Sequence, residues 1–208
     1  MASIRITSVD PPFDNAALVD PSMRLLRLAL ALGLIGENET VDRLNVETVR
    51  SIALEASAAG IGRDVAVGLL ERDLQPSRWA LLVSQLAESL AESPLPDRET
   101  RELLRVFDRD ELSSLLGTSP VSLGRYISGA RKWPDDLASR VHWLALVTSD
   151  LLGAYNEFGV RRWFGRPRTR LRGRSPREIL ARDWSPEAPD VERVRELASS
   201  LAGVGSAT

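Results

Sequence analysis

Few residues in this sequence could carry out catalysis. The 208 residues include one histidine and no cysteine, which excludes zinc–thiolate sites, cysteine nucleophiles and every site that needs two histidines. The single histidine, His142, lies in the apolar stretch 140–144, and no glycine-flanked serine elbow is present to act with it. We therefore expect His142 to be a structural residue packed in the core, and we expect the protein not to be an enzyme.

Cofactor and metal sites are not indicated either. The sequence Gly60-Ile61-Gly62 lacks the third glycine of a dinucleotide-binding fingerprint, and no strand is expected before it. No phosphate-binding loop of the Gly-Lys-Ser/Thr type is present, and no pair of carboxylates stands out from an ordinary solvated helix face. The sequence thus predicts a protein that works without a cofactor or a metal.

The strongest chemical signal is a cluster of arginines near the C-terminus. Eight arginines and no acidic residue occupy positions 161–177. The chain as a whole has a net charge of −2, but residues 1–100 carry 9 basic and 15 acidic side chains, net −6, whereas residues 101–208 carry 18 basic and 14 acidic, net +4. A compositional preference for arginine explains why lysine is rare, but it does not explain clustering without counter-charge. The asymmetry predicts an anionic partner for the C-terminal half.

The overall composition is that of an ordinary globular protein. Apolar residues make up 43% of the chain and charged residues 27%, and a chain of this length buries roughly 70% of its unfolded surface. The most apolar run, 25–35, contains Arg27 and is too short to span a bilayer. The N-terminus lacks the basic start and apolar stretch of a secretion signal. We expect a cytoplasmic protein without membrane contact.

The first half of the chain is expected to be an arm followed by helices. Residues 1–20 are predicted to be irregular, because a short β-prone stretch at 4–9 runs into prolines. From residue 21 to residue 95 the apolar residues recur at helical spacing, which predicts a helical region of unknown role. The prolines within 93–96 mark the best candidate for a boundary.

Local capping signals divide the second half into shorter helices. Ser119 followed by Pro120 is typical of an N-cap and a first helical residue, and the sequence from Ser175 to Glu178 has the pattern of a capping box. Asp97, Asp110 and Asp190 are further expected caps. The predicted helices are 98–107, 111–116, 120–128, 135–152, 176–182 and 190–201, with a frayed tail at 203–208. The expected fold class is all-α.

A pair of short helices between residues 111 and 129 is typical of a helix-turn-helix. Leu112 and Leu116 share one helix face, Gly117 can make a tight reversal, and Leu123 and Tyr126 share a face of the next helix. This spacing lets the two helices share one small core and present the second to the major groove. A generic helical hairpin is the alternative interpretation.

The same stretch resembles the Xre-type helix-turn-helix. The resemblance covers Leu112-Ser113, residues 116–119 and 122–126, and the trailing sequence 128–134. The polar residues placed to contact DNA are Ser119, Ser122 and Arg125, while Arg131 and Lys132 are placed to contact phosphates. Arg125 can pair with guanine, but Pro120, Val121 and Gly124 offer little for reading bases, so we expect a weak reader of sequence.

The segment that follows is similar to the toxin-binding domain of the MbcA/ParS/Xre antitoxin family. The resemblance rests on Tyr155-Asn156-Glu157-Phe158-Gly159-Val160-Arg161-Arg162-Trp163-Phe164, then Pro167, Leu171, Gly173, Ser175-Pro176 and residues 179–184. It implies a helix-turn-helix that represses the antitoxin's own promoter and a C-terminal domain that blocks a RES-type toxin, an enzyme that consumes or transfers from NAD. The residues expected to contact the partner are Trp163, Arg166, Arg168, Arg170, Arg172 and Gly173. The alternative for Trp163 is that it packs the last helices together.

These predictions combine into one organisation of the chain. An irregular arm (1–20) and a helical N-terminal region (21–95) precede an Xre-like helix-turn-helix (96–150), a small helical toxin-binding-like domain (151–202) and a tail (203–208). The two resemblances cover about residues 97–202 and imply nothing about the N-terminal region. We expect a homodimeric, DNA-binding, antitoxin-like regulator that binds operator DNA and a RES-type toxin. The alternative is a stand-alone transcriptional regulator without a toxin, whose arginines follow the DNA backbone.

Overall fold

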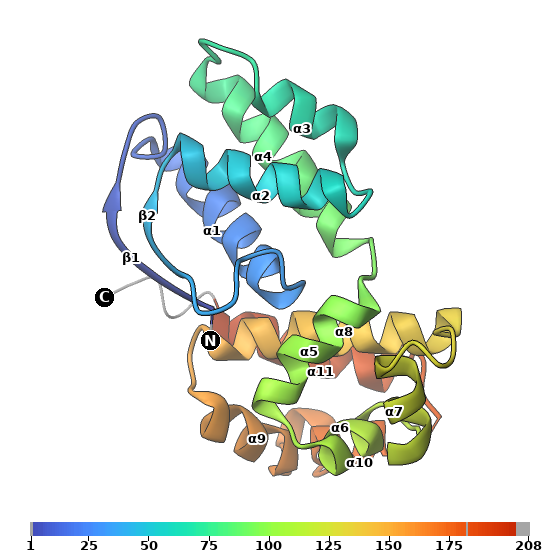
Figure 1. Ribbon diagram of the computed structural model, residues 1–208. Helices are drawn as coiled ribbons and strands as arrows, with labels where there is room; N and C mark the ends of the chain where they lie inside the picture. The colour runs from blue at the N-terminus through green and yellow to red at the C-terminus, as the bar shows by residue number, and fades with distance from the viewer. Residues whose placement is uncertain (1, 182, 203–208) are drawn as a thin grey trace. The chain divides into compact units, whose positions relative to one another are not determined.

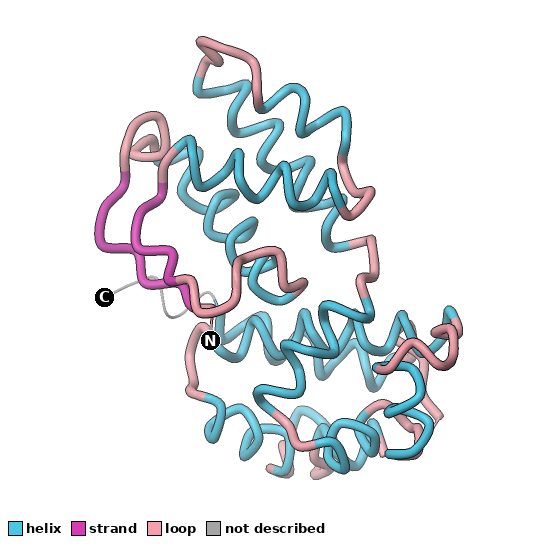
Figure 2. Tube along the Cα trace, in the orientation of Figure 1, coloured by secondary structure: helices cyan, strands magenta, loops and turns pink. Residues whose placement is uncertain are grey.

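The computed structural model describes residues 2–181 and 183–202, and the expected tail at 203–208 lies outside the described residues. Eleven α-helices and two short strands lie in the described part of the chain (Figures 1 and 2). The chain divides into two compact units between Pro94 and Leu95. The prediction of a mainly helical fold is confirmed, and the first unit also contains a small parallel sheet that was not expected.

The sheet forms where an irregular arm was expected. Strand β1 (Ser3–Val9) pairs in parallel with β2 (Thr40–Leu44), and helix α1 (Ala16–Ala31) connects the two strands. The predicted arm 1–20 therefore contains a strand and the first residues of a helix. The β-prone stretch was visible in the sequence, but its partner strand lies 35 to 37 residues further on, and such a pairing depends on how α1 folds back rather than on local preference.

Four helices make up the rest of the first unit. Helix α1 begins at an Asn15 cap and continues through Pro21, where the sequence favoured a break. It packs against α4 (Pro76–Ala91), and α2 (Val46–Ala58) and α3 (Arg63–Leu69) complete the layer. Phe13 meets Trp79 edge-to-face at 5.4 Å in the core of the unit.

The second unit is built around one long buried helix. Helix α8 (Asp135–Leu152) is buried along most of its length and packs against α5 (Pro96–Val106), α9 (Glu157–Gly165) and α11 (Pro189–Ala202). The remaining elements are α6 (Arg109–Leu115), α7 (Pro120–Ile127), the 3-10 helix η1 (Thr169–Leu171) and α10 (Pro176–Leu180). The sequence divided this part of the chain into two domains, 96–150 and 151–202. Since α8 contacts α5 as well as α9 and α11, both segments lie together in this one unit.

Several helix boundaries follow their predicted caps and others do not. Ser119 and Ser175 cap α7 and α10 as predicted, each accepting a hydrogen bond from the backbone N–H three residues on. Asp97, Asp110 and Asp190 lie inside their helices, because those helices begin one or two residues earlier, at Pro96, at Arg109 with Asp108 as its cap, and at Pro189. Helix α9 was not expected, and it carries Phe158, Trp163 and two arginines, Arg161 and Arg162.

The capping box at α10 gives a first testable prediction. The Ser175 N–H donates to Glu178 Oε2 (2.7 Å), and the Glu178 N–H donates to Ser175 Oγ (3.2 Å). The Ser175 N–H and the Ser175 hydroxyl both donate to Glu178 Oε2 and hold the pKa of the Glu178 carboxyl below its ordinary value, so their contribution is present at neutral pH and lost as the pH falls through that lowered pKa. We expect Ser175→Ala to lower the free energy of unfolding by about 1 kcal/mol, measured by urea unfolding. Ser114→Ala, at an exposed position within α6, is the control and should cause no loss.

None of the helices in the described ranges is both long and apolar enough to cross a lipid bilayer.

Candidate DNA-binding and partner-binding surfaces

Helices α6 and α7 pack against each other around the predicted leucines. Leu112, Leu116, Leu123 and Tyr126 are all buried. Gly117 sits in the connecting turn with φ at +69°, a left-handed conformation that glycine adopts at little cost. The C-terminal carbonyls of α6 are satisfied from other elements, because the Trp184 indole N–H donates to Leu115 O (2.9 Å) and Arg140 donates to Leu116 O (3.3 Å).

The outer face of α7 offers few free polar groups. The Ser122 N–H donates to Ser119 Oγ (3.1 Å), and the Ser119 hydroxyl donates to Ser122 Oγ (3.0 Å), so both predicted DNA-contacting hydroxyls already bond each other. Val121 is 67% exposed beside them. Arg125 is exposed and is the one long polar side chain within α7. Direct contact with bases would therefore depend on Arg125.

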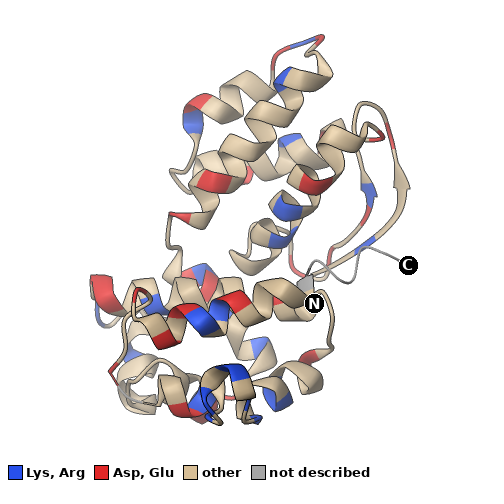
Figure 3. Ribbon diagram, turned by 180° about the vertical axis from the view of Figure 1, so that it is seen from behind, with Lys and Arg blue, Asp and Glu red and all other residues tan. Residues whose placement is uncertain are grey.

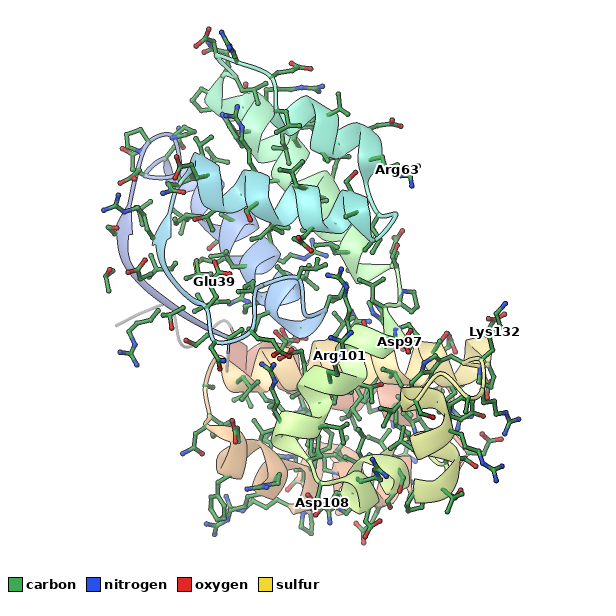
Figure 4. The ribbon with its side chains drawn as sticks, viewed as in Figure 1. Glu39, Arg63, Asp97, Arg101, Asp108 and Lys132 are labelled. Carbon is green, nitrogen blue, oxygen red and sulfur yellow. The ribbon has the colours of Figure 1, made fainter. Side chains whose placement is uncertain are left out.

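The predicted phosphate contacts lie just beyond the C-terminal end of α7. The Arg131 guanidinium lies over the Tyr126 ring (5.2 Å), and Tyr126 stacks on Trp133 (5.0 Å). The Trp133 indole N–H donates to Asp97 Oδ1 (2.7 Å), which ties this loop to α5. The Lys132 side chain points away from the unit (Figure 4). Arg131 and Lys132 are thus exposed on a loop held by an aromatic stack.

An acidic groove lies at the opposite, N-terminal end of α7. It has a volume of about 430 Å³ and is lined mainly by polar residues, among them Asp110, Ser114, Thr118 and Asp183, together with Pro120. The Asp183 carboxylate is paired with the Arg140 guanidinium, which offsets its charge, and Asp110 adds a second carboxylate beside the helix end. The charge around α7 is therefore divided, with carboxylates at its start and cations after its end.

The eight clustered arginines fall into two groups in the structure. Arg174 pairs with Asp190, and Arg177 donates to Glu111 Oε1 (2.6 Å). The other six have no carboxylate within 4 Å among the described residues. Figure 3 shows several basic positions gathered at the lower end of the second unit. We call these six residues the arginine surface: Arg161, Arg162, Arg166, Arg168, Arg170 and Arg172.

The loop that carries four of the six residues of the arginine surface is closed by its own backbone. The Arg168 N–H donates to Arg174 O (3.0 Å), the Gly173 N–H donates to Arg168 O (3.0 Å), and Leu171 is buried beneath the loop. Arg172 and Gly173 both have left-handed φ values, +57° and +78°. Nothing lies within 4 Å of a Cβ added at Gly173, so glycine is favoured there by backbone conformation and not by space. Arg166, Arg170 and Arg172 are exposed on this ordered loop.

Trp163 lies in the core, which contradicts its predicted role as an exposed partner contact. Its side chain is 2% exposed, its ring contacts Phe164 at 5.3 Å, and the Arg168 guanidinium covers it at 4.4 Å. Burial of Arg168 lowers the pKa of its guanidinium from the ordinary value. The alternative, that Trp163 packs the last helices together, is what the structure shows.

Two exposed aromatic residues beside the arginine surface were missed. Phe158 on α9 is 64% exposed, and Tyr155 just before α9 is 40% exposed. A Cβ added at Gly159 would lie 2.9 Å from the Tyr155 Cβ, so a glycine is needed where Tyr155 packs across the first turn. The spacing of Val160, Trp163 and Phe164 marks the buried face of α9, and Phe158 is out of phase with it. That periodicity was the available signal.

His142 is a core residue, as predicted. It is buried on α8, and its Nδ1 lies 2.5 Å from Oε1 of the buried Glu99 on α5. Glu99 Oε2 also accepts a hydrogen bond from the Leu95 N–H (3.2 Å). Within residues 2–181 and 183–202, no group of three His, Asp or Glu side chains is placed to hold a metal ion.

Comparisons with known proteins return no match. The chain matches no protein-family model, no curated protein and no solved structure. The resemblance to the antitoxin family therefore rests on the quoted residues alone and stays a prediction.

Proposed function

We propose that the chain is an antitoxin-like, DNA-binding regulator, not an enzyme, that neutralises a RES-type, NAD-targeting toxin by protein binding and represses its own operon. The observation that carries this proposal is the arginine surface, six arginines without carboxylate partners on an ordered scaffold. Arg174 and Arg177, in the same stretch of sequence, are paired. The difference favours a role for the six that lies outside the chain.

The arginine surface favours an anionic partner for electrostatic reasons. Six guanidinium groups within twelve residues repel one another, and a bound anion relieves this repulsion. Arginine also makes planar, two-pronged hydrogen bonds with carboxylates and phosphates. In this proposal the loop 166–174 contacts carboxylates on the surface of the toxin.

The proposed DNA contact uses the cationic end of α7. Arg125 pairs with a guanine, while Arg131 and Lys132 contact phosphates. With a single base contact, the protein binds DNA with modest sequence discrimination. A homodimer supplies a second half-site about 34 Å away and so strengthens the binding.

Co-expression with the product of the adjacent gene tests the toxin role. The wild-type chain is expected to suppress the toxicity of an adjacent RES-like gene and to co-purify with its product. Replacing the exposed arginines Arg166, Arg170 and Arg172 with alanine is expected to abolish both effects. The matched control removes three exposed arginines from the first unit, Arg5, Arg24 and Arg72, and should retain both. Failure of the wild type to co-purify with, or to neutralise, any adjacent RES-like product rejects the proposal.

A stand-alone transcriptional regulator is the second candidate, and the exposed cations Arg125, Arg131 and Lys132 favour it. Binding to the native upstream DNA separates the two. Arg125→Ala should cost about 1–3 kcal/mol of discrimination between bases. If Arg168→Ala with Arg170→Ala lowers the affinity for every sequence and flattens the salt dependence, the arginine surface contacts DNA and the stand-alone role is supported. If DNA affinity is unchanged, the arginine surface serves a protein partner.

A further inference from the structure

We infer that the exposed face of α9 docks a protein partner by inserting Phe158 into an apolar cleft that is rimmed by carboxylates. This inference rests on the proposed function, because it assigns the contact through which the toxin is held. It adds Phe158 to the contact residues and places Arg161 and Arg162 of the arginine surface beside it.

The two faces of α9 differ sharply. Val160, Trp163 and Phe164 are buried and seat the helix against the unit. Phe158 lies on the opposite side, 64% exposed, and Arg161 and Arg162 are exposed one turn further along. Residues three and four positions apart are neighbours on a helix surface, so the aromatic ring and both guanidinium groups form one contiguous face.

The composition of this face favours a protein over a nucleic acid. Aromatic residues and arginine are enriched at the centres of protein interfaces and supply most of the binding energy there. Single-stranded nucleic acid is held by a series of aromatic rings that stack on successive bases, whereas Phe158 is a single ring, with Tyr155 packed across Gly159. The phenylalanine side chain has no polar atom, so its burial is most favourable in an apolar cleft.

The positive charge of Arg161 and Arg162 determines which groups surround that cleft on the partner. Arg161 and Arg162 have no carboxylate within 4 Å among the described residues, and the arginine surface continues from them through the 166–172 loop. A partner that buries Phe158 must bring its own anionic groups close to these guanidinium groups. The rim of the cleft is therefore acidic.

The face is also held rigid before binding. The Asn156 side chain caps α9 by accepting the Gly159 N–H (2.9 Å), and Tyr155 packs across the same first turn. Phe164 fixes the other side of the helix in the core. Because α9 is already ordered, little conformational entropy is lost when Phe158 is bound.

The experiment titrates the purified full-length chain with the purified product of the adjacent gene, using calorimetry at low and high salt. Phe158→Ala is expected to weaken binding about 30-fold, the size of effect typical of an interface hot spot, and Phe158→Leu less than Phe158→Ala. Arg161→Glu with Arg162→Glu is expected to weaken binding about 100-fold at low salt and less at high salt, because salt screens exposed charges. The control is Leu54→Ala, which removes an exposed leucine of the first unit and should leave binding unchanged.

The outcomes separate the inference from the proposed function. If the wild type and Phe158→Ala bind the partner equally, the inference is overturned and the proposed function stands. If the wild type does not bind, both are rejected. If Phe158→Ala weakens binding to the upstream DNA and not to the protein, the face contacts nucleic acid and the inference is wrong. Circular dichroism spectra that match the wild type confirm that each variant is folded.

Discussion

Replacing Phe164 with alanine is expected to lower the free energy of unfolding of the second unit by about 3–5 kcal/mol. Phe164 is fully buried at the point where α9 meets α5. Its ring meets Phe107 edge-to-face, with centroids 5.4 Å apart and planes at 82°, and it also contacts Trp163. The substitution removes both aromatic contacts and leaves a cavity that the surrounding helices can only partly close. Urea unfolding, monitored by hydrogen exchange of the amides in the second unit, measures the decrease in the free energy of unfolding.

The matched control for this prediction lies on the same helix. Phe158→Ala removes the same side chain from the exposed face of α9 and is expected to change the free energy of unfolding by less than about 0.5 kcal/mol. The two variants thus separate folding from binding, because Phe164→Ala is expected to lower stability and Phe158→Ala to weaken binding of the partner. Equal losses in the two variants would show that α9 does not have one buried and one exposed face.

Replacing Glu99 with alanine is expected to cost about 2–5 kcal/mol of stability. The buried carboxylate accepts the Leu95 N–H at the start of α5 and lies 2.5 Å from His142 Nδ1 on α8. Alanine removes both acceptors at once, from a site where water does not replace them. Glu99→Gln keeps the shape and one amide oxygen, so we expect a smaller loss. Urea unfolding at neutral pH measures both variants.

The pH dependence of the same pair has a defined sign. Burial raises the pKa of the Glu99 carboxyl above its ordinary value, and the hydrogen bond to His142 opposes this effect. The native state therefore holds this proton more tightly than the unfolded state does, and the resulting stabilisation is lost as the pH rises through the raised pKa. The free energy of unfolding of the wild type, measured relative to Glu99→Gln, should fall as the pH rises above 4.5, the ordinary pKa of the carboxyl. A difference that grows with pH would contradict the assignment of burial as the dominant cause.

The helices with strong local signals were predictable from the sequence. The capping box from Ser175 to Glu178 and the Ser119-Pro120 start of α7 were both confirmed, because a cap is made by residues three positions apart. The apolar setting of His142 also predicted its burial correctly. Each of these predictions depends on interactions within a few residues, which the sequence displays directly.

Features that depend on distant residues were not predictable in the same way. The pairing of β1 with β2 joins residues 35 to 37 positions apart, so the sequence showed the β-prone stretch at 4–9 but not its partner strand. Trp163 and Phe158 lie in the same apolar-basic stretch, and the side of α9 that faces α5 and α10 decides which of them is buried. The caps of α5 and α6 shifted by two residues because more than one acidic or proline residue could start each helix.

The eight clustered arginines show most clearly what the sequence determines and what the tertiary structure decides. The sequence by itself determined that they cluster between residues 161 and 177 with no acidic residue in that interval. Only the tertiary structure decided which of them remain available, because Asp190 comes from α11 to pair with Arg174, and Glu111 comes from α6, 66 residues away, to pair with Arg177. An ion pair needs its partners within about 4 Å in space, and packing of the helices, not separation along the chain, sets that distance.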